Sequence, residues 1–305
     1  MKSSMTSHAL VFILMVIAVH VHPQRSTPAP PPPKPGPSLP KATSGFGMVL
    51  HKLPAGSFRM GSENGNFDEK PVRTVKINSF FIATTETTYA QWIKVHDWAR
   101  GKGYVFDGFE GIDTRAAYRS SLQCPMNKVS WFDCIKWCNA ASEMDRRTPC
   151  YAIGTTVLKQ GNPTNIICTW TVNGYRLPTG AEWEYAARAG AATRFPWGSS
   201  FDDDYCWYYN NSGGTTHPVG EKRTNAWGIH DMSGNVFEWC WDAYQENYRG
   251  LDTDNPKGPQ GIPEYRVFRG GAFNYLIFNA RPAHRSGLMP NYRLEYIGFR
   301  IASSL

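Results

Sequence analysis

A chain of 305 residues with 41% hydrophobic residues, 11 tryptophans, 15 tyrosines and 16 phenylalanines has enough apolar side chains for one large domain or two ordinary ones. The formal net charge is +7, but the basic residues are scattered and form no run of five or more Lys or Arg. This distribution excludes the basic face that nucleic-acid binding requires, so we expect no nucleic-acid partner.

Residues 1–24 have the pattern of a signal peptide. Lys2 precedes an apolar run of eleven residues, 9–19, which is shorter than the ~20 residues of a membrane span and suits the apolar region of an export signal. The alternative, an uncleaved N-terminal anchor, is disfavoured by the same length. No cysteine directly follows the run, so no lipoprotein motif can be drawn. We predict an exported protein, secreted or held at the cell surface.

A proline-rich stretch follows the signal peptide. Residues 25–45 include four consecutive prolines and favour an extended polyproline II spacer, which cannot pack a core. No second linker of this composition occurs later. We therefore expect residues 46–305 to form one domain.

Three helices are predicted in this domain, at residues 88–99, 130–142 and 179–189. Each begins at a Thr or Ser whose side chain can cap the helix, with Gln, Asp or Glu three residues later. These pairs are Thr88 with Gln91, Ser130 with Asp133, and Thr179 with Glu182.

Short strands are expected along the whole domain. Residues 47–53 and 56–61 predict a hairpin around Pro54 and Ala55, and residues 72–77 alternate as a half-buried strand does. The remaining candidates are residues 80–83, 168–172, 239–241, 266–268 and 298–302. Helices in the first part of the domain, followed by irregular chain with short strands, favour an α+β fold.

Four stretches together resemble one protein family. They are MGS (residues 60–62), NGYRLPTGAEWEYAAR (173–188), GIHDMSGNVFEW (228–239), and RGG (269–271) followed by GFR (298–300). Their order and spacing are similar to the formylglycine-generating enzyme, or sulfatase-modifying factor, domain family. The resemblance implies a C-type lectin-like α+β fold of the formylglycine-generating-enzyme type, rich in irregular structure, over about residues 46–302. A shared fold does not by itself carry an activity.

The loop 231–238 is a candidate calcium site. A glycine in the loop lets backbone carbonyls converge beside two carboxylates, and ligand sets made only of oxygen suit Ca²⁺. The resemblance implies four ligands, the carboxylates of Asp231 and Glu238 and the carbonyls of Gly234 and Val236. Alternatively, the two carboxylates only hydrogen-bond the loop, and both interpretations stay open. A second calcium site of the family is not expected, because residues 208–219 contain no acid.

The enzyme of this family uses two cysteines, just after the Gly-Gly turn, that bind copper. Here no cysteine follows Cys240, and the positions four and nine residues after Gly271 are Tyr275 and Ala280. Cu(I) selects soft thiolate ligands, so we expect no copper and no sulfatase-activating reaction. No serine or cysteine lies in a recognisable nucleophile motif, and the eight histidines show no paired metal spacing. We predict that the chain is not an enzyme.

The C-terminal segment, residues 266–300, is the main candidate for a functional surface. Between strand-like ends it contains aromatic and aliphatic residues with neither helical nor strand periodicity. Its frame of Arg, Gly and Pro is similar to the variable region of proteins diversified by retroelements, and especially to the treponemal variable protein. In such systems a reverse transcriptase copies a template and mutates its adenines.

This second resemblance implies a set of diversified, ligand-binding side chains. They are Tyr275, Leu276, Ile277, His284, Ser286, Gly287, Leu288, Met289, Asn291, Tyr292, Leu294, Glu295 and Tyr296. Met289 and Glu295 fit less well, because a mutated asparagine codon yields neither residue. Independently, tyrosines with few rotatable bonds are good anchors of binding faces, and clustered aliphatic side chains mark interaction surfaces. Ile277 and Phe278 are the residues most expected to pack against the domain instead.

These observations favour a non-enzymatic ligand-binding protein, with a protein or other macromolecule as its partner. An oxidoreductase with a degenerate active site is the first alternative, and copper binding would distinguish it. A carbohydrate-binding lectin is the second, although the sequence lacks the Glu-Pro-Asn type of loop that such lectins use. Ligand identity and oligomeric state do not follow from the sequence.

Overall fold

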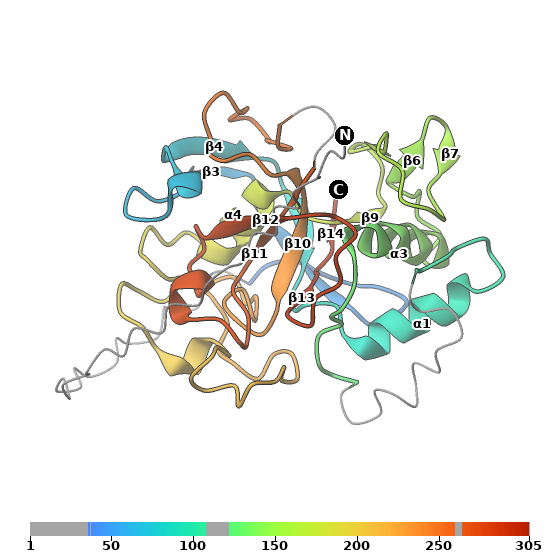
Figure 1. Cartoon of the computed structure of the whole chain (residues 1–305). Coiled ribbons are helices and arrows are strands. Elements are labelled where there is room, and N and C mark those ends of the chain that lie inside the picture. Colours follow the sequence, from blue (N-terminus) through green and yellow to red (C-terminus); the bar gives the residue numbers. More distant parts are fainter. Residues whose placement is uncertain (1–35, 37, 108–121, 260–263, 305) are drawn as a thin grey trace, which may run out of the picture.

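Two sheets form the centre of the molecule in the computed structural model, which describes residues 36, 38–107, 122–259 and 264–304 (Figure 1). The predicted signal peptide lies outside these residues. The first sheet is antiparallel, and its strands in spatial order are β1 (Lys41–Thr43), β2 (Val49–Leu53), β5 (Phe80–Ala83), β14 (Ala302–Ser303) and β9 (Tyr175–Arg176).

The second sheet carries the C-terminal segment. Its strands in spatial order are β12 (Arg285–Leu288), β11 (Arg266–Arg269), β10 (Phe237–Ala243) and β13 (Ile297–Gly298). The pair of β10 and β13 is parallel, and the other two pairs are antiparallel. Two small sheets lie outside these, one of β3 (Gly56–Met60) and β4 (Arg73–Ile77), the other of β7 (Thr156–Val157), β6 (Tyr151–Ile153) and β8 (Ile167–Cys168).

The three predicted helices are present, and each begins at the predicted cap. They are α1 (Tyr89–Ala99), α3 (Trp131–Met144) and α4 (Gly180–Arg188), capped by Thr88, Ser130 and Thr179. In each case the cap side chain and the residue three positions later bond each other's backbone N–H. Figure 1 shows α1 and α3 together on one side of the central strands and α4 on the other. None of the helices described is long and apolar enough to cross a membrane.

The predicted hairpin of residues 47–53 and 56–61 is wrong. Both strands exist, but β2 pairs with β1 and β5, whereas β3 pairs with β4. Because β2 already has a neighbour on each edge, no edge is left for β3. The chain therefore leaves the first sheet at Pro54 and starts a separate one.

Three predicted boundaries also differ from the structure. β1 lies within residues 25–45, so part of the expected spacer forms an edge strand of the first sheet. The expected strand 168–172 is limited to the pair in β8. The expected strand 298–302 is divided between β13 and β14, because the chain crosses from the second sheet to the first there.

Large aromatic side chains join the helices to the second sheet. Trp131 in α3 donates its indole N–H to the Cys240 carbonyl at 2.9 Å, and Trp239 in β10 donates to the Val129 carbonyl at 3.0 Å. Both rings are fully buried. A buried indole with its N–H satisfied contributes apolar area without a desolvation penalty. These two reciprocal contacts fix the start of α3 beside β10, next to the C-terminal segment.

Candidate functional site

The C-terminal segment leaves β11, turns at two glycines, forms the short helix η3 (Ile277–Ala280) and returns as β12. Gly270 and Gly271 have φ values of 108° and 78°, a region that only glycine adopts readily. A Cβ atom on Gly271 would also lie 2.9 Å from the backbone of Ala280. The turn therefore requires glycine, and it places η3 directly over the end of β11.

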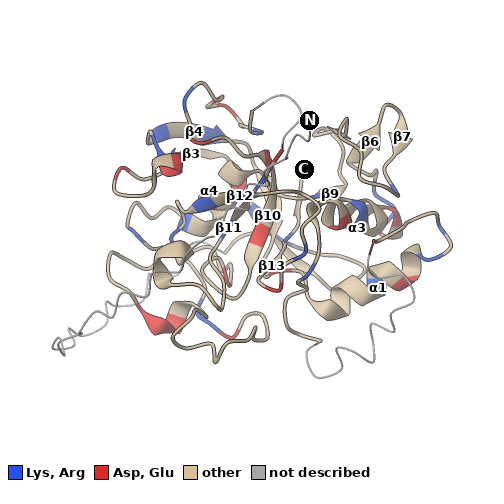
Figure 2. Ribbon diagram, viewed as in Figure 1, with Lys and Arg blue, Asp and Glu red and all other residues tan. Residues whose placement is uncertain are grey.

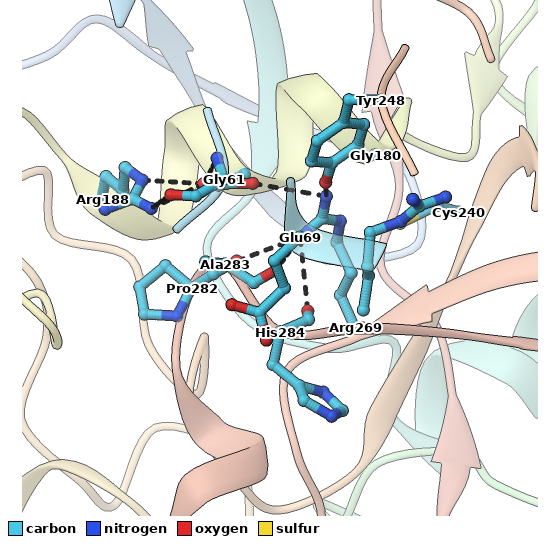
Figure 3. Close-up of polar contacts among 12 residues, drawn as sticks. Gly61, Glu69, Gly180, Arg188, Cys240, Tyr248, Arg269, Pro282, Ala283 and His284 are labelled. Carbon is cyan, nitrogen blue, oxygen red and sulfur yellow. Dashed lines mark hydrogen bonds and ion pairs between the residues drawn. The ribbon is translucent and has the colours of Figure 1, made fainter. Parts of the chain in front are cut away.

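Arg269, the last residue of β11, holds the main chain that follows η3 (Figure 3). One of its terminal nitrogens, Nη1, donates to the carbonyls of Pro282 and His284 at 3.0 and 3.3 Å. The other, Nη2, donates to the Tyr248 hydroxyl at 2.7 Å and lies 3.3 Å from a carboxylate oxygen of Glu184. The Arg269 side chain is fully buried, so these bonds are shielded from solvent.

Two further arginines fix the segment to distant parts of the chain. Arg281 forms a buried bidentate pair with Glu69 of η1 (Phe67–Glu69), with nitrogen to oxygen distances of 2.6 and 2.7 Å. Arg293 donates to the Asp133 carboxylate in the first turn of α3, with an ion-pair distance of 2.8 Å. Planar guanidinium–carboxylate pairs set orientation as well as distance. The main chain of the segment is thus fixed near its middle and near its end.

Several side chains of the segment point away from this frame. Exposed fractions are 62% for Leu276, 45% for Tyr292, and 36% for both Phe278 and Met289. Asn291 and Glu295 are exposed as well. Phe278, which was expected to pack against the domain, does so only in part: its ring covers the Arg281 guanidinium at 3.9 Å and meets His284 edge to face, and 36% of the residue stays exposed.

Other predicted ligand-binding residues are half-buried. Ile277 packs against the aromatic cluster around Trp197, as expected. Tyr275 and Tyr296 contact each other edge to face, with ring centroids 5.0 Å apart, and the Tyr275 ring also contacts Phe237 at 4.9 Å. Ser286, Leu288 and Leu294 are half-buried too. Of the three tyrosines predicted as anchors, only Tyr292 is classed as exposed.

The structure corrects the predictions for His284 and Gly287. His284 is only 5% exposed, and its ring nitrogen Nε2 lies 3.0 Å from the side-chain amide nitrogen of Asn279. Burial, with Arg281 and Arg269 nearby, lowers the pKa of His284 to about 3. A Cβ atom on Gly287 would lie 2.5 Å from the Tyr244 ring. Neither position offers a side chain to a ligand.

Sequence reasoning missed two exposed tyrosines. Tyr209 is 63% exposed and donates its backbone N–H to the Tyr275 carbonyl at 3.0 Å, so it adjoins the C-terminal segment. Tyr265 is 36% exposed and immediately precedes β11. Tyr209 lies in a loop that the sequence analysis considered only for its lack of acids, and no local pattern indicates its contact with Tyr275.

The candidate calcium loop is buried and has an unusual main chain. Asp231, Gly234 and Asn235 take left-handed conformations, with φ of 56°, 84° and 61°. Within the described part of the chain, the Gly234 and Val236 carbonyl oxygens accept no hydrogen bond, which suits a bound cation. The two carbonyl oxygens predicted as ligands are therefore compatible with a bound Ca²⁺.

The two carboxylates of the loop have protein partners. Glu238 accepts from Nε and Nη2 of Arg300 at 2.6 and 2.7 Å, and Trp183 donates to the same carboxylate at 2.7 Å. Asp231 accepts the Gly220 N–H at 2.7 Å. Oε1 of Glu238 takes only one of these bonds and keeps a lone pair that could bind a cation. In the residues that the structure describes, no three His, Cys, Asp or Glu side chains converge to hold a metal ion.

All seven cysteines are buried and free. Burial raises the pKa of Cys150 to about 11 and that of Cys206 to about 12, so both stay protonated at neutral pH. Thiols in such surroundings are inert rather than nucleophilic. Of the two positions that the resemblance singled out, Tyr275 lies against Phe237, and Ala280 is buried beneath the glycine turn.

Comparison with known proteins places this geometry in a family. The family model described as "Sulfatase-modifying factor enzyme 1-like domain" matches residues 38–305. The chain belongs to this family. Formylglycine-generating enzyme of Streptomyces coelicolor is 31% identical over 285 residues, covering 83% of this chain and 88% of the relative. Chaperone protein LppX of Paenibacillus barcinonensis is 33% identical over 256 residues, covering 74% and 82%.

A solved structure extends the comparison. Treponema denticola variable protein 1 superposes with a TM-score of 0.72 and 27% identity, covering 88% of this chain and 100% of that protein. The predicted α+β fold of the formylglycine-generating-enzyme type is confirmed. The relatives include an enzyme, a chaperone protein and a variable protein. The activity of this member therefore has to be argued from its own residues.

The buried pair of Glu69 and Arg281 predicts a large stability loss when it is broken. Replacing Glu69 by Ala leaves a buried guanidinium unpaired, and we expect a loss of about 3–5 kcal/mol in the free energy of unfolding. Urea unfolding measures it. The matched control is Asp204→Ala, which breaks the solvent-exposed pair with Arg223 and should cost less than about 1 kcal/mol. Equal losses in both variants would contradict a buried clamp.

His284 predicts a pH-dependent stability. Its pKa in the folded protein is about 3, below the ordinary value of 6.5, so between these values only the unfolded chain takes up the proton. The stabilisation is present above pH 6.5 and is lost as the pH falls, by about 1.4 kcal/mol per pH unit. Urea unfolding at pH 7, 6 and 5 should show a steeper decline than in His284→Gln. Parallel declines in the two proteins would mean that His284 titrates normally.

Proposed function

We propose that this protein is an exported, non-enzymatic ligand-binding protein whose C-terminal segment is diversified by a retroelement. One observation carries the proposal. The buried Arg269 and Arg281 and the half-buried Arg293 hold the main chain of the segment. Its exposed apolar side chains are Leu276, Phe278, Met289 and Tyr292. Binding residues are commonly carried on loops that a rigid scaffold positions.

The contacts of Arg269 support the idea that the segment tolerates changes in sequence. This arginine binds backbone carbonyls at positions 282 and 284, which almost any residue offers equally well. Side chains that point into solvent can then change with stability effects usually within about 0.5 kcal/mol. A preformed main chain also lowers the entropy cost of binding. The likeness to the treponemal variable protein agrees with this interpretation.

A protein or other macromolecule is the partner that the surface fits best. Exposed aromatic and aliphatic side chains on one segment provide the apolar area that buried interface centres require. Catalysis has less support, because the buried thiols are poor nucleophiles and poor copper ligands. The signal peptide predicted from the sequence supports export to the cell surface or the medium.

The retroelement proposal predicts a template in the source genome. We expect a near-copy of the DNA that encodes residues 266–300, downstream of this gene and beside a reverse transcriptase gene. Asparagine codons in that copy should align with exposed positions such as Leu276 and Tyr292. The codons for His284 and Gly287 should match between copy and gene, because the structure leaves no room for variation there. Sequencing the genome around this gene tests the prediction. The absence of such a copy would contradict diversification by a retroelement.

We also propose that the loop 231–238 binds a structural Ca²⁺ through the Gly234 and Val236 carbonyls and the Asp231 and Glu238 carboxylates. Ca²⁺ at 100-fold excess over its dissociation constant should raise the free energy of unfolding by about 2.7 kcal/mol. Thermal unfolding tests this binding. It is measured with Ca²⁺, with a chelator, and with Mg²⁺ as the control, because Mg²⁺ suits such flexible sites poorly. An unchanged midpoint at about 10 mM Ca²⁺, above the dissociation constants of weak extracellular sites, would exclude the ion.

A further inference from the structure

A basic pocket adjoins the exposed end of the C-terminal segment. The cavity has a volume of about 730 Å³ and lies between the loop after β3, the loop after α4 and the chain around η3. Four arginines line it (Arg59, Arg188, Arg194 and Arg281), and Glu63 is the only acid among its lining residues. Figure 2 shows basic residues on α4 and the neighbouring loops on this side of the molecule.

Two of the four arginines are already neutralised within the fold. Arg188 pairs with Glu184 at 2.7 Å and donates to the Gly61 carbonyl at 3.0 Å. Arg281 forms an ion pair with Glu69 at 2.6 Å. These two side chains therefore form the back of the pocket, and they contribute little free charge.

Arg59 and Arg194 are different. Both are exposed, and neither has an ion-pair partner in the part of the chain that the structure covers. The one nearby acid, Glu63, uses a carboxylate oxygen to accept the Val72 N–H at 3.0 Å. The pocket therefore presents two guanidinium groups that are free to bind an anion, and each can bind a carboxylate through two parallel hydrogen bonds.

One aromatic side chain lies among the residues that line the pocket. Phe278 lines the cavity, is partly exposed and is held in place by its contact with Arg281. Leu276, which has the largest exposed fraction among the exposed large hydrophobic residues of the segment, precedes it by two positions. A sulfated glycan would use the charges but has no aliphatic side chain to place against Leu276. A peptide with an acidic side chain next to an apolar one would use both the arginines and these apolar side chains.

We infer that this pocket binds an acidic peptide segment of the partner, with Arg59 and Arg194 holding a carboxylate and Phe278 and Leu276 contacting the neighbouring apolar side chain. The inference rests on the proposed ligand-binding function and specifies the chemistry of its partner. Because the charges lie outside residues 266–300, the acidic preference is carried by the scaffold and persists when the segment varies.

Selection from a random dodecapeptide display library against the purified domain tests the inference. We expect enriched peptides with Asp or Glu beside an apolar residue, and weaker binding at high salt because exposed charge pairs are screened. In Arg59→Ala/Arg194→Ala the affinity for these peptides should fall about tenfold or more, the loss expected for hydrogen bonds to a charged group. The control Arg100→Ala/Arg249→Ala removes the same charge elsewhere on the surface and should change affinity by less than about twofold.

A charge reversal gives a second, independent readout. The variant Arg59→Glu/Arg194→Glu should enrich peptides with Lys or Arg from the same library. Its melting temperature should stay close to that of the parent, because neither arginine has an ion pair within the described residues. An unchanged peptide preference would overturn the inference.

The remaining outcomes separate this inference from the proposed function. Enriched peptides without acids, which bind the double alanine variant equally well, would overturn the basic pocket and leave ligand binding intact. Heparin binding through Arg59 and Arg194 with no enriched peptide would overturn the choice of a peptide. If neither binds, the inference fails, and the genomic template then decides the proposed function alone.

Discussion

Buried arginines paired with carboxylates are the interaction on which this structure depends. Arg269 with Glu184, Arg281 with Glu69, and Arg300 with Glu238 all lie in the interior. Removing these charges from water costs several kcal/mol for each ion, and close geometry with additional hydrogen bonds to carbonyls offsets that cost. A protein with so little regular secondary structure uses such contacts where another fold would use longer strands or helices.

These contacts also separate the fixed part of the C-terminal segment from its exposed part. The arginines bind carbonyl oxygens and distant carboxylates, and Arg281 also contacts the exposed ring of Phe278. The backbone atoms of the segment carry most of its stabilising contacts, and several of its side chains are left exposed. The basic pocket beside η3 lies next to these exposed side chains.

Local signals in the sequence were sufficient for the helices and for the family. The caps at Thr88, Ser130 and Thr179 act within one turn, so they can be recognised without knowledge of the rest of the fold. Strand pairing is not local, which is why the hairpin prediction for β2 and β3 failed. A strand candidate shows its own periodicity, but nothing in it names its partner.

The candidate site was harder to predict for the same reason. An aperiodic segment gives no indication of which side chain points inward. Phe278 was expected inside but stays 36% exposed, and His284 was expected at the binding face but is buried. Gly287 is constrained by Tyr244, which precedes it far along the chain. Exposure in such a segment follows from the glycine turn and the arginine contacts, and both become visible only in three dimensions.

The position of β14 has a consequence for how the chain is made. This strand follows the C-terminal segment in the sequence, yet it lies inside the first sheet between β5 and β9. A polypeptide that ends before residue 302 lacks this inner strand, and β5 and β9 then face each other with unpaired backbone groups. Such truncated chains are candidates for proteolysis. The first sheet therefore closes only after the ribosome has completed the C-terminal segment, although most of the strands in that sheet come from the first part of the domain.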